Sequence, residues 1–237
     1  MSPAFPTFGP AHLAILAAVP LAAAALAALA RRRRGAERPI RLALAAALAA
    51  NELAWYVHAL RSGGVRPPHG LPLDLCDLVL WLTVWALAAP RPALLEIVYD
   101  LGLAGSGMAL LTPDPGASLT SYAGAKFFVA HGGVVAAILF LAAAGALRPR
   151  PGAWRRVFLW VNAYAALVAL FDWRFGTNYM YLREKPASAS LLDALGPWPW
   201  YVLAAEPLAL ALLWLLHLPF RRGGGAPRPT RPPGAAA

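Results

Sequence analysis

Cys76 is the one cysteine of the chain and the residue whose chemistry is easiest to specify. It lies in the segment 71–77 (LPLDLCD), close to the start of an apolar stretch. A thiol near the amino end of a helix can act as a nucleophile, although two neighbouring aspartates oppose its ionisation. A lone cysteine in an apolar helix also fits a small packing residue. Because there is no second cysteine, a disulfide within the chain is excluded.

A histidine further along the chain could serve as the base for that thiol. His131 lies one to two helical turns into the apolar stretch that opens at Lys126. If both stretches cross a membrane in the same direction, Cys76 and His131 lie at similar depth. A thiol and an imidazole at one depth permit a nucleophile and base pair. Asp74 could orient the imidazole, since a carboxylate commonly fixes the tautomer of a histidine.

A second set of polar groups consists of carboxylates inside apolar stretches: Glu52, Glu96, Asp100 and Glu206. A charged side chain at the centre of a bilayer costs roughly 2.5–3.5 kcal/mol on insertion scales, so these groups should face the interior of a bundle. Such carboxylates can mark a proton or ion path, or they can hydrogen-bond between helices. The sequence leaves both possibilities open.

Seven apolar stretches must position these groups, and they begin near Gly9, Ile40, Leu71, Ala93, Lys126, Val157 and Pro199. Each lasts roughly 18–22 residues, the length that one helical crossing of a bilayer requires. We therefore predict an all-α, polytopic membrane protein: a single domain of seven transmembrane helices over residues 1–222. Residues 223–237 are Gly, Pro, Arg, Thr and Ala, which predicts a disordered cytoplasmic tail.

The positive residues predict the orientation of the bundle. Fifteen of the 21 Lys and Arg residues fall in the tail and in the loops after the first, third and fifth stretches, and six fall on the opposite face. Positive residues collect on the cytoplasmic side of a membrane. We therefore expect the amino terminus outside and the carboxyl terminus in the cytoplasm, with Cys76 and His131 toward the non-cytoplasmic leaflet.

The composition excludes an ordinary soluble domain, because 59% of the residues are hydrophobic and only 14% are charged. The net charge of +10 arises mainly from the loops that set the topology, so we expect membrane lipids as partners and no nucleic acid. The excess of Arg over Lys, together with abundant Ala and Pro, is typical of a GC-rich coding bias. We therefore expect a multi-pass protein of the bacterial cell membrane. Nothing in the chain indicates its oligomeric state.

The sequence predicts neither a metal nor a cofactor. His58, His69 and His131 are not spaced as metal ligands relative to one another. The chain also lacks a glycine-rich loop of the kind that holds a nucleotide phosphate.

Several short segments together resemble a known family. They are residues 71–76, 111–114, 131–132, 178–182, 185–186 and 196–201, in that order and spacing. This pattern resembles the YwaF-like family of bacterial integral membrane proteins, and the likeness extends over nearly all seven stretches. That family is similar to an animal transmembrane protein described as an acyltransferase for ether phospholipids. The resemblance implies a catalytic pair of Cys76 and His131. Family members often carry a histidine at the position of Asp74.

These observations lead to one preferred hypothesis and two alternatives. The preferred one is a lipid acyltransferase or hydrolase with Cys76 as nucleophile, His131 as base and Asp74 beside them. We expect Asn178, Tyr179, Lys185 and Glu206 to contact the substrate. The alternatives are a proton-coupled transporter and a non-enzymatic bundle whose polar residues serve only packing.

Overall fold

The computed structural model describes residues 6–186 and 190–221, and the predicted tail over 223–237 lies outside them. The α-helices are α1 (Pro10–Arg32), α2 (Glu37–Arg61), α3 (Leu75–Ala88), α4 (Pro92–Leu101), α5 (Met108–Leu111), α6 (Tyr122–Ala143), α7 (Ala153–Phe175), α8 (Trp200–Leu216) and α9 (Leu218–Arg221). A π-helix, η1 (Gly102–Gly107), joins α4 to α5, and two short 3-10 helices are η2 (Tyr179–Tyr181) and η3 (Leu191–Leu195).

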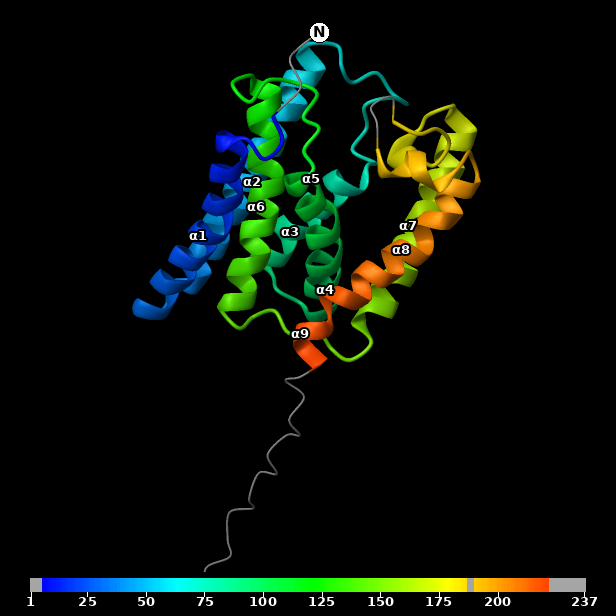
Figure 1. Ribbon diagram of the computed structural model, residues 1–237. Coiled ribbons are helices and arrows are strands. Elements are labelled where there is room, and N and C mark those ends of the chain that lie inside the picture. Colours follow the sequence, from blue (N-terminus) through cyan, green and yellow to red (C-terminus); the bar gives the residue numbers. More distant parts are fainter. Residues whose placement is uncertain (1–5, 187–189, 222–237) are drawn as a thin grey trace, which may run out of the picture.

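Six of these helical segments are long and apolar enough to cross a bilayer, and α3 is a shorter apolar helix of 14 residues. The prediction of an all-helical, multi-pass membrane protein is confirmed. In Figure 1, α1, α2 and α6 form one flank of the bundle, α3 and α4 lie in the middle, and α7 with α8 form the other flank. Helix α6 packs against α1, α2, α3 and η1, so it is the central helix of the larger flank.

The third apolar stretch becomes helical later than its start at Leu71 suggests. Residues up to Asp74 are not helical, and Asp74 is the N-cap of α3 with extended backbone angles. The reason lies in contacts to other elements. The backbone N–H of Leu71 donates to the Tyr179 hydroxyl at 2.8 Å, and the Tyr164 hydroxyl donates to the Leu73 carbonyl at 2.8 Å. These tertiary bonds hold the segment extended and place Cys76 in the first helical turn.

Small residues allow the central helices to approach closely. A β-carbon at Gly102 would overlap the side chain of Ile138, and one at Gly133 would crowd Leu48 of α2. The close approach buries Val98, Ile138 and other large side chains between α3, α4 and α6. Without a hydrophobic driving force between helices in lipid, such close packing is a main source of association.

The faces of α7 and α8 away from the bundle carry exposed leucines, among them Leu159, Leu167 and Leu203. Exposed leucines on long helices fit contact with lipid chains, which are as apolar as leucine itself. The larger flank and the α7–α8 pair both contribute to the polar sites described below.

Candidate functional site

The amino end of α3 presents Cys76 at the surface of a large cavity. The cavity has a volume of about 950 Å³, and the cysteine side chain is exposed rather than packed. Its walls come from the last turns of α2, the segment 62–71, the start of α3, α5 and its following loop, α6, and residues 177–181. We call this side of the bundle the cavity end. Its lining includes seven His, Asp and Cys side chains: His58, His69, Asp74, Cys76, Asp77, Asp114 and His131.

His131 of α6 also lines this cavity. Its Nδ1 lies 2.8 Å from the carbonyl oxygen of Phe127, one turn earlier in the helix. A carbonyl only accepts, so Nδ1 carries the hydrogen of that bond and Nε2 remains the basic nitrogen of the neutral ring. The ring of Phe127 packs beside the imidazole with centroids 4.3 Å apart. The imidazole is therefore oriented by its own helix.

Asp74 lines the cavity but is engaged with a different element. Its Oδ1 accepts the backbone N–H of Met180 at 2.8 Å. Desolvation raises the pKa of the Asp74 carboxyl above its ordinary value, and the bond from Met180 opposes that shift. The contact that orients His131 is the Phe127 carbonyl, so the observed bonds of Asp74 give it a different task, fixing the loop after α7.

Asn178 and Tyr179 lie in the cavity wall, and their polar groups hold that wall together. The amide of Asn178 donates to the Glu184 carbonyl at 2.9 Å, and its oxygen accepts two backbone N–H groups at 3.0 Å each. The buried Tyr179 donates its hydroxyl to the Pro68 carbonyl and accepts from Leu71, both at 2.8 Å. Any contact of these two residues with a substrate must use surfaces other than these bonded groups.

Lys185 and Glu206 are not among the residues that line this cavity. The Nζ of Lys185 lies 3.7 Å from Oδ1 of Asp193 and 5.6 Å from the centre of the Tyr201 ring. Glu206 accepts a hydrogen bond from the Asn162 amide at 3.0 Å and lines a smaller neighbouring cavity between α7 and α8. The structure therefore does not bring these two residues to Cys76.

Asp172 is an organising residue that sequence reasoning did not select. It is fully buried, and its Oδ1 accepts the Thr177 hydroxyl at 2.6 Å and the Tyr179 N–H at 3.0 Å. Its backbone carbonyl accepts from the guanidinium of Arg183 at 3.1 Å. A carboxylate in the last turn of a helix is disfavoured by the helix dipole, and that unfavourable placement was the available signal.

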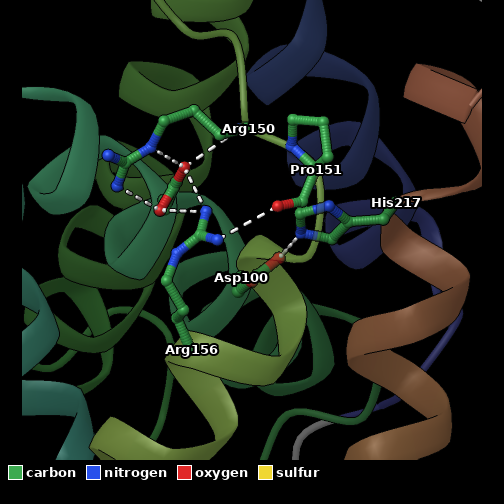
Figure 2. A network of polar contacts seen from close by, with 6 residues as sticks. Asp100, Arg150, Pro151, Arg156 and His217 are labelled. Carbon is green, nitrogen blue, oxygen red and sulfur yellow. Dashed lines mark hydrogen bonds and ion pairs between the residues drawn. The ribbon is translucent and has the colours of Figure 1, made fainter.

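The opposite side of the bundle, which we call the basic end, contains a network around Glu96 of α4. Figure 2 shows Arg150 and Arg156 converging on this carboxylate. Arg150 donates from Nε and Nη2 at 2.7 and 2.9 Å and from its backbone N–H at 2.9 Å. Arg156 donates from Nη2 to both oxygens at 3.0 and 3.1 Å. Glu96 thereby ties the loop before α7 and the first turn of α7 to α4.

A second connection at the basic end joins α4 to the end of α8. The buried Asp100 lies with Oδ1 2.8 Å from Nε2 of His217, as Figure 2 shows, while its Oδ2 is buried without a hydrogen bond. One residue earlier, the Tyr99 hydroxyl donates to the Leu216 carbonyl at 2.7 Å. These bonds hold the carboxyl end of α8 against the middle of the bundle.

Glu52 of α2 also has a specific partner. It is fully buried, and its two oxygens lie 3.1 and 3.3 Å from Nζ of Lys126 in α6. The same ammonium lies 5.3 Å from the centre of the Trp55 ring. This ion pair links two helices of the larger flank. Glu52, Glu96 and Asp100 thus each have a partner side chain on another element.

Within the described residues, no group of three or more His, Cys, Asp or Glu side chains is arranged to hold a metal ion. Comparison with known families gives one match, to the TMEM164 family over residues 7–217. The chain belongs to the TMEM164 family. The match spans α1 to α8, and it therefore includes the cavity, Cys76, His131 and the Glu96 network. No curated protein and no solved structure matches the chain. In this multi-pass membrane protein of the TMEM164 family, Cys76 and His131 both line the cavity at one end of the bundle.

Proposed function

We propose that the protein is a cysteine-dependent lipid acyltransferase or hydrolase, as the resemblance to the YwaF-like and ether-phospholipid acyltransferase families implies. The observation that carries the proposal is the placement of Cys76 and His131 in the walls of one large cavity. The thiol is exposed to that space, and the imidazole is held with Nε2 as its basic nitrogen. A nucleophile and an oriented base facing one space are what acyl transfer through a covalent intermediate needs.

In the first half-reaction, the Cys76 sulfur attacks the carbonyl carbon of a phospholipid ester while His131 Nε2 takes the thiol proton. The negative charges of Asp74 and Asp77 oppose a standing thiolate, so proton removal accompanies attack. The tetrahedral intermediate collapses by breaking the ester C–O bond, and the imidazolium returns its proton to the departing lysophospholipid oxygen. The product of this step is an acyl thioester on Cys76.

In the second half-reaction, a hydroxyl group of an acceptor lipid, or water, attacks the thioester carbonyl. His131 removes the proton of the attacking hydroxyl and then protonates the departing Cys76 sulfur. The acceptor leaves as an ester, or the acyl group leaves as a fatty acid. Each half-reaction balances without an oxidant, reductant or metal ion.

The amino end of α3 supplies a place for the oxyanion. The N–H groups of Asp77 and Leu78 bond to the Asp74 carbonyl at 3.1 and 3.2 Å. Leu75 and Cys76 are the first two residues of α3, whose N–H groups have no partner within the helix. A developing oxyanion beside the sulfur would be stabilised by the Cys76 N–H and by the positive end of the helix dipole.

Turnover by purified protein tests the proposal. Wild type, Cys76→Ala and His131→Ala would be reconstituted with a phospholipid donor and a lysophospholipid acceptor, and acyl transfer and free fatty acid would be measured. We expect both variants to lose turnover. His58→Ala is the matched control, because His58 also lines the cavity and is not assigned a role in the reaction. Lipid turnover that is unchanged in both Cys76→Ala and His131→Ala would refute the proposal.

The positive-inside pattern supports a cavity that opens toward the non-cytoplasmic leaflet of a bacterial cell membrane. Two single-cysteine reporters in a Cys76→Ala background test this orientation in intact cells. Thr120→Cys places a thiol in the exposed loop at the cavity end, and Arg34→Cys places one in the exposed loop at the basic end. A membrane-impermeant maleimide should label only the first. Labelling of Arg34→Cys alone would reverse the orientation.

A further inference from the structure

A second cavity lies between α7 and α8 and differs in character from the first. It has a volume of about 200 Å³, and its lining is largely aliphatic, with Val161 and Ala165 from α7 and Val202, Ala205 and Ala209 from α8. We call it the α7–α8 slot. The residues of α8 that line it extend from position 201 to 209, which corresponds to about 12 Å along the helix. Its dimensions and lining suit a linear apolar chain.

The slot adjoins the large cavity at the residue next to the nucleophile. Leu75, Met180 and Tyr181 line both spaces. Leu75 directly precedes Cys76 in the first turn of α3, and Cys76 itself lines the large cavity. A chain that is covalently attached at Cys76 would meet the slot at this shared wall.

The backbone of the shared wall is held in an unusual conformation. Met180 and Tyr181 have φ angles of 56° and 55°, in the left-handed region that residues with a side chain rarely adopt. Asp74 binds the Met180 N–H, and the Tyr201 hydroxyl of α8 donates to the Tyr181 carbonyl. Backbone strain of this kind persists where surrounding contacts impose it, commonly at functional sites. Contacts from α3 and α8 thus fix the wall between the two spaces.

We propose that the α7–α8 slot binds the acyl chain of the substrate, with its carbonyl at Cys76 and its methylenes between α7 and α8. This assignment rests on the proposed function. The slot contains one polar pair, Glu206 and Asn162, which are bonded to one another at 3.0 Å. This pair is one polar point in the otherwise largely aliphatic lining. The slot extends about 12 Å along α8, so it favours acyl chains that are long enough to fill it.

Binding of fatty acids to a Cys76→Ala protein tests the slot without requiring turnover. Palmitic and octanoic acid would displace a fluorescent fatty acid from the protein in detergent, and a diazirine-bearing palmitate would map the contact by photo-crosslinking. Ala205→Phe and Ala209→Phe each place a ring in the slot. Ala211→Phe is the matched control, because Ala211 is exposed on the same helix and is not a lining residue.

We expect Ala205→Phe or Ala209→Phe to weaken palmitate binding about tenfold or more, since each methylene that is no longer buried costs about fourfold. Octanoate is shorter than the slot, so Ala209→Phe should change its binding less than that of palmitate, and Ala211→Phe should leave the binding of both acids unchanged. Crosslinks in the Cys76→Ala protein should fall on α7 and α8. The assignment of the slot would be refuted if both slot variants bound palmitate as tightly as the Cys76→Ala parent, or if crosslinks were confined to helices other than α7 and α8. If palmitate binds in the slot while Cys76→Ala retains full lipid turnover, the proposed cysteine-dependent reaction is refuted, and binding of an acyl chain in the slot is still supported.

Discussion

The two ends of this bundle use the same residue types in opposite ways. At the basic end, Glu96 is surrounded by five donor contacts from Arg150 and Arg156, and Asp100 is bonded to His217. At the cavity end, Asp74, Cys76, Asp77, Asp114 and His131 line about 950 Å³ of space.

The difference teaches where chemistry can occur. A buried carboxylate whose oxygens are occupied by fixed donors contributes to helix association and has little capacity left for a substrate. A thiol that faces a cavity, and an imidazole with one basic nitrogen, retain their capacity to react. The intramembrane carboxylates were the basis of the transporter alternative. Glu52, Glu96 and Glu206 each bond to a side chain of another element, and Asp100 bonds to His217 through Oδ1 alone.

The largest expected effect is on turnover, at the cavity end. His131→Gln removes the basic nitrogen while keeping a side chain of similar size. We expect lipid turnover to fall about 100- to 10,000-fold, the usual contribution of a general base. His58→Gln should lower turnover little. A fall of the same size in both variants would show that the cavity, and not His131 in particular, carries the effect.

The next largest effect is on stability, at the Glu52–Lys126 pair. Lys126→Met leaves a fully buried carboxylate without its partner, which should lower the free energy of unfolding by about 3 kcal/mol. Denaturation by SDS in mixed micelles measures the change. Lys185→Met is the control, because its ion pair with Asp193 is partly exposed and the expected loss is within about 1 kcal/mol. Recovery of stability in the double variant Glu52→Gln/Lys126→Met would confirm that the unpaired charge is the cause.

A smaller loss of stability is expected at the basic end. Glu96→Ala removes the acceptor of two guanidinium groups, both of which are about half exposed and can be hydrated. We therefore expect a loss of about 2 kcal/mol in the same assay, below the range for fully buried pairs. Lipid turnover per folded molecule should stay near wild type. Glu184→Ala, at an exposed position, should change neither quantity. A large loss of turnover in folded Glu96→Ala protein would contradict the view that the basic end contributes to stability and not to the reaction.

The smallest expected effect is on the reactivity of the thiol. Asp74→Asn removes a negative charge near Cys76 while its amide oxygen can still accept the Met180 N–H. We expect alkylation of Cys76 by iodoacetamide at neutral pH to become about threefold faster, because less electrostatic work opposes the thiolate. Ser118→Asn, an exposed change in another loop at the cavity end, serves as the control. Slower alkylation in Asp74→Asn would mean that the carboxylate assists ionisation of the thiol.

Much of the fold followed from the sequence, because bilayer thickness imposes a length on every crossing helix. That constraint predicted the seven apolar stretches. It also predicted that Cys76 and His131 lie at similar depth, since each lies near the start of a stretch and both stretches were predicted to run in the same direction. The start of α3 was predicted too early, because bonds from Tyr164 and Tyr179 hold the preceding segment extended. Local pattern carries no information about partners that are ninety or more residues away.

The partners of the buried carboxylates could not be predicted from the sequence either. Glu96 is satisfied by arginines 54 and 60 residues later, and Glu52 by a lysine 74 residues later. A carboxylate in an apolar stretch is expected to have a polar partner, but the hydropathy pattern does not identify which residue that partner is. Lys185 and Glu206 were expected to contact the substrate, and the structure places them beside Asp193 and Asn162 respectively.

The most direct test of the account is the mass of Cys76 after exposure to a phospholipid donor. Purified wild-type protein would be mixed with donor lipid in the absence of acceptor, quenched in acid and digested, and the peptide that contains Cys76 would be weighed. The account predicts an acyl adduct on that peptide, labile to hydroxylamine, that is strongly reduced in His131→Gln and present in Glu96→Ala. Lipid turnover that proceeds with no adduct on Cys76, and that persists in Cys76→Ala, would contradict it.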